Sequence, residues 1–123
     1  MLSHEEMEVL VDMMNELKAY KHSAHVITDL IKDEITYEKV FDLLYNDLEL
    51  LLDILSDMIR WYDPVSIARP YEFPPNGDEE RHSMLWYIRE TIFEEAILTH
   101  PWLYERDEKT GRQPVLDYYR YLV

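Results

Sequence analysis

Between positions 37 and 62, apolar residues recur at alternating intervals of four and three, and this series constrains the fold more than any other feature. It comprises Tyr37, Phe41, Leu44, Leu48, Leu51, Leu55, Met58 and Tyr62. The spacing predicts one long amphipathic helix that starts after a Thr36 N-cap and stops at Asp63-Pro64. Further leucines and isoleucines widen the apolar side, so we expect this helix at the centre of the fold or at a contact between subunits.

The start of the chain carries a second helical pattern. Ser3 and Glu6 match a capping box, in which each side chain accepts a hydrogen bond from the other residue's backbone N–H. Apolar residues then follow at helical intervals, at Met7, Leu10, Met14 and Leu17. Because the periodicity continues, we favour one helix that reaches about residue 33 over two helices with a bend near His22-Ser23.

The second half of the chain begins with a proline-rich segment, residues 64–77, which predicts a loop. A helix opened by the acids at 78–80 follows and ends at His100-Pro101. Its inner face is expected to comprise Leu85, Ile88, Ile92 and Ala96. Residues 102–116 suit either a short hairpin that turns at Gly111 or a plain loop, and Pro114 suits the first turn of a terminal helix.

These patterns predict a mostly α fold with a single domain over residues 1–123. We expect a small antiparallel helical bundle of four to five helices, with the proline-rich segment as a crossover loop. The chain has no cysteine, which excludes disulfides and thiolate metal sites. Its start lacks the basic and apolar regions of a signal peptide, and no stretch is apolar enough to span a membrane. We therefore expect a cytoplasmic protein, in the host cytoplasm if it is viral.

The chain is strongly acidic. Its 26 acids oppose 12 bases, and the net charge is −14. This charge argues against direct binding to nucleic acid or to an anionic membrane, because both partners attract basic surfaces. It favours a basic protein as the partner, although solubility alone is the simpler explanation of a large net charge.

The acids follow the sides of the predicted helices. Between Val40 and Ile59 there are five acids and no lysine or arginine. Carboxylates one helical turn apart recur about every 5 Å, so two or three parallel stripes approach the charge density of duplex DNA. We expect these acids to bind the partner: Glu5, Glu8, Asp12 and Glu16 in the first helix, and Asp42, Asp47, Glu49, Asp53 and Asp57 in the central one.

Aromatic residues are a second candidate for partner contact. The chain has ten tyrosines and three tryptophans, and both residue types are favoured anchors at protein interfaces. Tyr118, Tyr119 and Tyr121 cannot all face one core from a short helix, so at least one of them should be exposed. Tyr37 and Tyr62 lie in the apolar series, and for them a half-buried core position with the hydroxyl reaching water is the better explanation.

Patterns that point to catalysis or metal binding are weak. His22 and His25 share a helical face with Asp29, and Glu79 with His82 forms one Glu-x-x-His pair, but a di-iron bundle needs two such pairs. Glu34 with Glu38 and Asp53 with Asp57 could hold Mg²⁺, yet their spacing departs from that of helical nucleotide pyrophosphohydrolases. We therefore expect no metal, no cofactor and no enzymatic activity.

In composition and helix patterning the chain resembles two kinds of small acidic helical inhibitors. One is the phage antirestriction and anti-CRISPR type that imitates nucleic acid, and the other is the nuclease-toxin immunity protein. The resemblance involves no specific motif and transfers no residues.

The favoured hypothesis is a stoichiometric inhibitor of a nucleic-acid-binding enzyme: a nuclease, a restriction enzyme or a CRISPR effector. Its acidic helical faces would occupy the basic groove of that enzyme. The first alternative is a helical structural or regulatory subunit that forms a homodimer through the helix at 41–62. The second alternative is a Mg²⁺-dependent nucleotide hydrolase.

Overall fold

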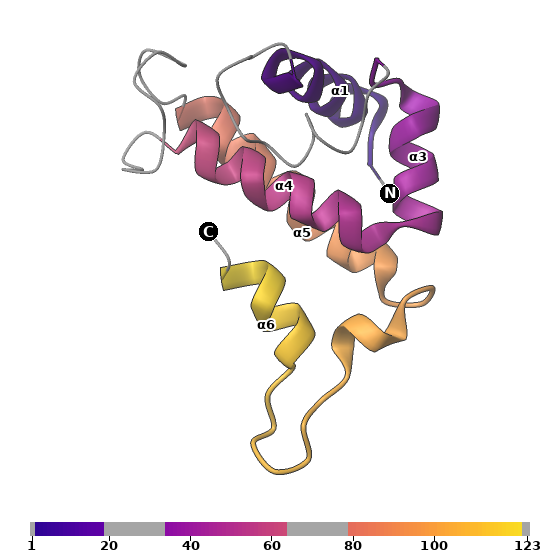
Figure 1. Ribbon diagram of the computed structural model, residues 1–123, viewed down its shortest axis with the longest axis vertical. Coiled ribbons are helices and arrows are strands. Elements are labelled where there is room, and N and C mark those ends of the chain that lie inside the picture. The colour runs from indigo at the N-terminus through magenta and orange to yellow at the C-terminus, as the bar shows by residue number, and fades with distance from the viewer. Residues whose placement is uncertain (1, 19–33, 64–78, 122–123) are drawn as a thin grey trace.

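The computed structural model describes residues 2–18, 34–63 and 79–121 (Figure 1). Within these segments the chain is helical and has no strand, which confirms the predicted mostly α fold. The helices are α1 (His4–Lys18), α3 (Tyr37–Asn46), α4 (Leu48–Tyr62), α5 (Glu79–Ala96), the short 3₁₀ helix η1 (Pro101–Tyr104) and α6 (Pro114–Tyr121). Two predictions lie outside the described residues: the extension of the first helix over 19–33 and the proline-rich loop at 64–77.

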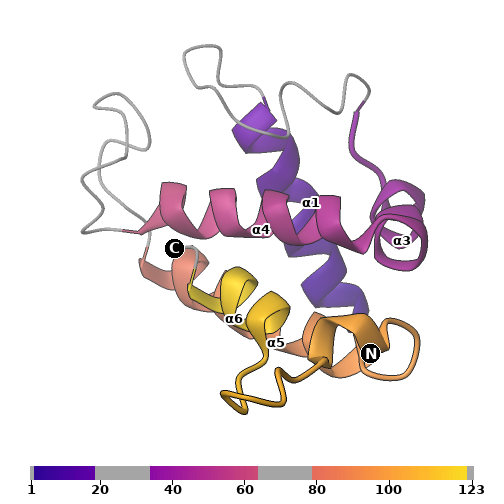
Figure 2. The same cartoon turned by 60° about the horizontal axis from the view of Figure 1, so that its bottom comes forward.

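The pair α4 and α5 lies at the centre of the fold, and its two helices run in opposite directions (Figure 2). Helix α1 crosses this pair at a steep angle, and α3 packs against both α1 and the start of α4. On the opposite side, η1 and α6 contact each other, and α6 also contacts α4 (Figure 1). The molecule therefore has a central helix pair with different elements on its two sides.

Both predicted N-caps are present. The Ser3 backbone N–H donates to Glu6 Oε1 at 3.2 Å, and the Glu6 N–H donates to Ser3 Oγ at 3.0 Å, so the capping box is complete. The Lys39 N–H donates to Thr36 Oγ1 at 3.2 Å. Each cap satisfies donors that the first turn of a helix leaves unpaired, which fixes where α1 and α3 begin.

The prediction of one continuous helix over 37–62 is wrong, because the chain bends at Asp47. This residue leaves helical geometry, with φ −149° and ψ 62°, and its backbone N–H closes α3 by donating to Leu43 O at 2.9 Å. Its carboxylate then accepts the Leu50 N–H at 3.4 Å and caps α4. The bend lets α3 pack against α1 while α4 packs against α5, so each helix buries apolar residues against a different neighbour.

The bend changes which apolar residues are inside. Leu51, Leu55, Met58 and Tyr62 of α4 are fully buried within the chain. Phe41 of α3, which the continuous pattern placed on the same inner seam, is 41% exposed. The homodimer through residues 41–62 stays a prediction, but most of the apolar side chains that suggested it are covered by the chain's own helices.

The inner faces of the other helices match their predicted patterns. The predicted inward residues of α1 and α5 are all buried, as are Leu116 and Tyr119 of α6. Helix α5 ends at Ala96, earlier than the predicted end at His100-Pro101, because a turn occupies residues 97–99. The local sequence pattern was therefore sufficient to identify these faces.

The predicted hairpin near the C-terminus is absent from the described chain, and the alternative of a plain loop holds only for residues 105–113, between η1 and α6. The Asp107 N–H donates to Arg112 O, and the Gly111 N–H donates to Asp107 O, both at 2.8 Å. Gly111 has φ 69°, a conformation that costs glycine little. These bonds close a single turn before α6, and η1 replaces the first expected strand.

Two arginine side chains, one buried and one partly exposed, attach α6 to α5. The Arg89 guanidinium is 1% exposed and donates from Nη1 to Tyr119 O at 3.1 Å, in the last turn of α6. It also lies 4.0 Å from the centroid of the Trp86 ring. Arg120 of α6 donates to Glu90 of α5 at 3.0 Å. Burial lowers the pKa of Arg89, the nearby Glu90 opposes that shift, and Arg120 adds to it.

Candidate acidic interface

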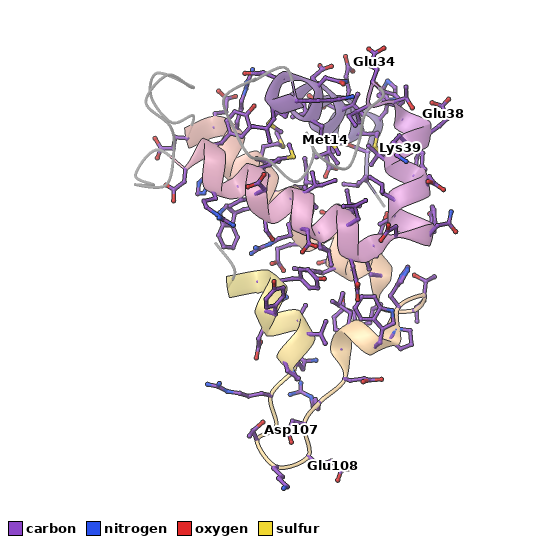
Figure 3. All side chains as sticks on the ribbon, in the orientation of Figure 1. Met14, Glu34, Glu38, Lys39, Asp107 and Glu108 are labelled. Carbon is purple, nitrogen blue, oxygen red and sulfur yellow. The ribbon has the colours of Figure 1, made fainter. Side chains whose placement is uncertain are left out.

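The first group of predicted acids lies where α1 meets α3. Glu8 and Asp12 are exposed on α1, close enough to Tyr37 of α3 to act on its ionisation. Burial is the main cause that raises the pKa of Tyr37, and the charges of Glu8 and Asp12 raise it further. Glu34 and Glu38 project from the same end of α3 (Figure 3). We call these five residues the α1/α3 acidic face.

No lysine or arginine of the described segments forms an ion pair with Glu8 or Asp12. Glu5, also exposed on α1, lies beside the start of α5 instead. Glu16 differs, because Arg81 of α5 forms an ion pair with it. The four predicted acids of α1 therefore do not share one environment.

The second group of predicted acids lies at the start of α4. Asp47, Glu49 and Asp53 act on one another and on Tyr119 of α6, which packs over this side of α4. We call these four residues the α4/α6 acidic cluster. Burial raises the pKa of Asp53, and the charges of Glu49 and Asp47 add to that rise. No base in the described segments forms an ion pair with these acids.

The same acids also affect the pKa of Tyr119. It is buried, and burial is the first cause that raises its pKa to about 12. The charges of Asp53, Glu49 and Asp47 also oppose its ionisation, as does the neighbouring Tyr118. Tyr118 is exposed beside this cluster, with its ring 5.1 Å from that of Tyr119 in an edge-to-face arrangement.

The remaining predicted acids are separated from the cluster. Asp42 lies on α3, where Lys39 approaches it at 3.9 Å and Asn46 donates to it at 2.9 Å. Asp57 is half-buried farther along α4. The five acids of the central segment therefore do not form one stripe, because the bend at Asp47 turns Asp42 away from the acids of α4.

An exposed apolar patch was not predicted from the sequence. It comprises Phe41 and Tyr45 of α3 and Ile97 and Leu98 in the turn after α5, and Leu98 is 89% exposed. A cavity of about 300 Å³ lies here, lined by Leu44, Tyr45, Ala96 and Leu98 among others. The run Tyr45-Asn46-Asp47 contains poor helix formers, and it was the one local signal that α3 ends and exposes this patch.

The weak metal patterns are not assembled by the described segments. No group of three or more histidines, aspartates or glutamates within them is arranged to hold a metal ion. His82 accepts a hydrogen bond from Trp86 Nε1 at 3.1 Å. His22, His25 and Asp29 lie outside the described residues. Among the helices that the structure describes, none has the length and apolarity to cross a bilayer.

Comparison with known proteins gives no family assignment. No protein-family model matches the chain, and no curated protein or solved structure is significantly similar to it.

Proposed function

We propose that this protein is a stoichiometric inhibitor of a nucleic-acid-binding enzyme, such as a nuclease, a restriction enzyme or a CRISPR effector. The observation that carries the proposal is a set of carboxylates that form no ion pair with a lysine or arginine of the described segments. Glu8 and Asp12 stand exposed on α1, and Asp53 lies close to Glu49 and Asp47 although burial, and then the charges of these two acids, raise its pKa.

The physical basis is the cost of holding like charges together. Neighbouring carboxylates on a helix destabilise it by a few tenths of a kcal/mol per pair, whereas Glu–Lys pairs stabilise it. A surface needed only for solubility gains nothing from such grouping, since mixed charges also keep a protein dissolved. A basic groove that normally holds phosphates would be attracted to both acidic groups.

Two aromatic side chains, one exposed and one half-buried, would supply specificity. Tyr118 is exposed beside the α4/α6 acidic cluster, and Tyr37 lies within the α1/α3 acidic face. Aromatic residues contribute contact area at a low cost in conformational entropy, so they suit the centre of an interface. Carboxylates around them would set the orientation and the rate of association.

The proposal is tested by capture and inhibition. The protein is immobilised and incubated with host lysate at low salt, and bound proteins are eluted by raising the salt concentration. We expect a basic nucleic-acid-processing enzyme whose cleavage activity falls in proportion to added inhibitor until the two are equimolar. Capture of proteins without a basic nucleic-acid site, or an enzyme that keeps its activity with excess inhibitor, would count against the proposal.

The exposed apolar patch favours a second candidate, a subunit that self-associates. Phe41, Tyr45, Ile97 and Leu98 lie outside the buried core, although large apolar side chains are usually covered. Sedimentation separates the two candidates. A stable dimer that dissociates in a Leu98→Asp variant would favour the subunit, and a monomer would favour the inhibitor.

A further inference from the structure

A groove of about 980 Å³ lies between the start of α1 and the first half of α5. Its lining includes Glu5 and Glu6 from α1 and Glu79, Glu80, Met84 and Tyr87 from α5. Sites for ligands and peptide side chains commonly measure about 300–1,000 Å³, so this groove can accept more than one side chain. It is separate from the α4/α6 acidic cluster.

The groove combines carboxylates with an apolar wall. Glu5, Glu79 and Glu80 are exposed, and no base of the described segments forms an ion pair with them. The wall between them is mainly apolar, and the ring of Tyr87 is 62% exposed in it. Arg81, which follows Glu80 in the chain, is engaged by Glu16 and lies 5.6 Å from the Tyr62 ring centroid.

Glu6 also lines the groove. One carboxylate oxygen, Oε1, accepts the Ser3 N–H and holds the side chain in place. The other oxygen, Oε2, is buried and has no donor in the structure.

We propose that this groove binds a short segment of the partner protein that carries arginine or lysine side chains. The inference rests on the proposed function in taking a basic protein as the partner. Arginine and lysine have long apolar stems below a charged head. The stems match the apolar wall at Met84, the heads match the carboxylates, and a guanidinium also stacks favourably on the Tyr87 ring.

The test uses a short peptide of alternating arginine and alanine and, as a control, the same peptide with neutral citrulline in place of arginine. Binding is followed by NMR of the isotope-labelled protein. We expect amide shifts concentrated at residues 3–6 and 79–87, and no saturable shift with the citrulline peptide.

Two variants that lose the same number of charges distinguish binding in the groove from general attraction of the peptide to an acidic protein. Glu5→Gln/Glu79→Gln/Glu80→Gln removes three charges from the groove, and Glu8→Gln/Asp12→Asn/Glu49→Gln removes three from elsewhere. We expect the groove variant to weaken peptide binding about tenfold more than the control variant, which corresponds to about 1.4 kcal/mol. Tyr87→Ala alone, at an exposed position that the fold tolerates, should also weaken binding.

Equal losses in the two triple variants, or shifts spread over α3 and α4, would overturn the groove proposal. The proposed function would survive that result if the control variant alone lost inhibition of the captured enzyme. If peptide binding is localised to the groove but no nucleic-acid enzyme is captured, the proposed function fails and the basic-segment site stands.

Discussion

The α1/α3 acidic face and the α4/α6 acidic cluster have similar composition but different environments. In the first, Glu8 and Asp12 are exposed on α1, and the nearby Tyr37 is half-buried. In the second, α6 packs Tyr119 over the acids of α4, so burial and repulsion act together on Asp53 and Tyr119.

This difference shows that acidic residues which look alike in the sequence can lower the stability of the folded state by different amounts. Solvent and salt screen the exposed acids of α1, over about 10 Å at 0.1 M ionic strength. Asp53, beside α6, is partly shielded from solvent, so burial and then the charges of the exposed Glu49 and Asp47 make its ionisation unfavourable in the folded state. Both groups are available to a basic partner, but only the second would also be relieved of a folding cost on binding.

The largest expected effect comes from removing the aromatic ring that covers the cluster. Tyr119→Ala deletes a buried ring and should lower the free energy of unfolding by about 3–5 kcal/mol. Tyr37→Ala deletes a half-buried ring from the other acidic region and should cost about 1–2 kcal/mol. Urea unfolding of the two variants measures the contrast, and equal losses would show that α6 does not shield the cluster.

A smaller effect on the free energy of unfolding is expected at alkaline pH. Folding raises the pKa of Tyr119 from 10.0 to about 12, so the folded state binds its proton more tightly than the unfolded state. This tighter proton binding contributes about 2–3 kcal/mol to the free energy of unfolding. The contribution is complete below pH 10 and is lost as the pH rises toward 12.

Tyr119→Phe should remove this part of the pH dependence, whereas Tyr118→Phe, at the exposed neighbour, should keep it. Unfolding free energies of the wild type and both variants across this pH range provide the measurement. A wild-type curve parallel to that of Tyr119→Phe would contradict the assigned environment of Tyr119.

The smallest expected effect on the free energy of unfolding comes from the ionisation of Asp53. Because folding raises its pKa above 3.8, ionisation disfavours the folded state, and stability falls as the pH rises through that raised value. Asp53→Asn should therefore stabilise the protein at neutral pH by about 0.5–1 kcal/mol, since desolvation adds to repulsion that alone costs a few tenths.

The gain from Asp53→Asn should disappear below about pH 3.8, where the wild-type carboxyl is protonated in both states. Asp12→Asn, on the exposed α1/α3 acidic face, should change stability by less than about 0.5 kcal/mol. A larger gain from Asp12→Asn than from Asp53→Asn would reverse the comparison between the two regions.

Features fixed by local interactions could be predicted from the sequence. The Ser3–Glu6 capping box, the Thr36 cap and the inward faces of α1 and α5 depend on residues within one or two helical turns. The start of α6 at Pro114 and the turn at Gly111 also follow from the conformational preferences of those residues.

Features fixed by tertiary packing could not be predicted. Asp47 interrupts an apolar series that continues through it, and the two helices then pack against different partners, α3 against α1 and α4 against α5, which lie far away in the sequence. The same holds for the candidate interface: the pairing of Glu16 with Arg81 and the packing of Tyr119 over α4 join residues far apart in sequence. The sequence identified which residues are acidic, and the fold decides which acids lie together.

The most direct test of the acidic interface is an inhibition titration with a charge-reversal variant. Glu8→Lys/Asp12→Lys/Glu49→Lys changes exposed acids from both regions and leaves the Asp47 cap intact. Wild type and variant are titrated against DNA or RNA cleavage by the captured enzyme, and circular dichroism checks that both are folded. We predict that the variant, with unchanged helicity, inhibits at least about a hundredfold more weakly, because each reversal places a like charge against the basic groove. Undiminished inhibition by the folded variant would contradict the proposal that these acidic surfaces bind the target.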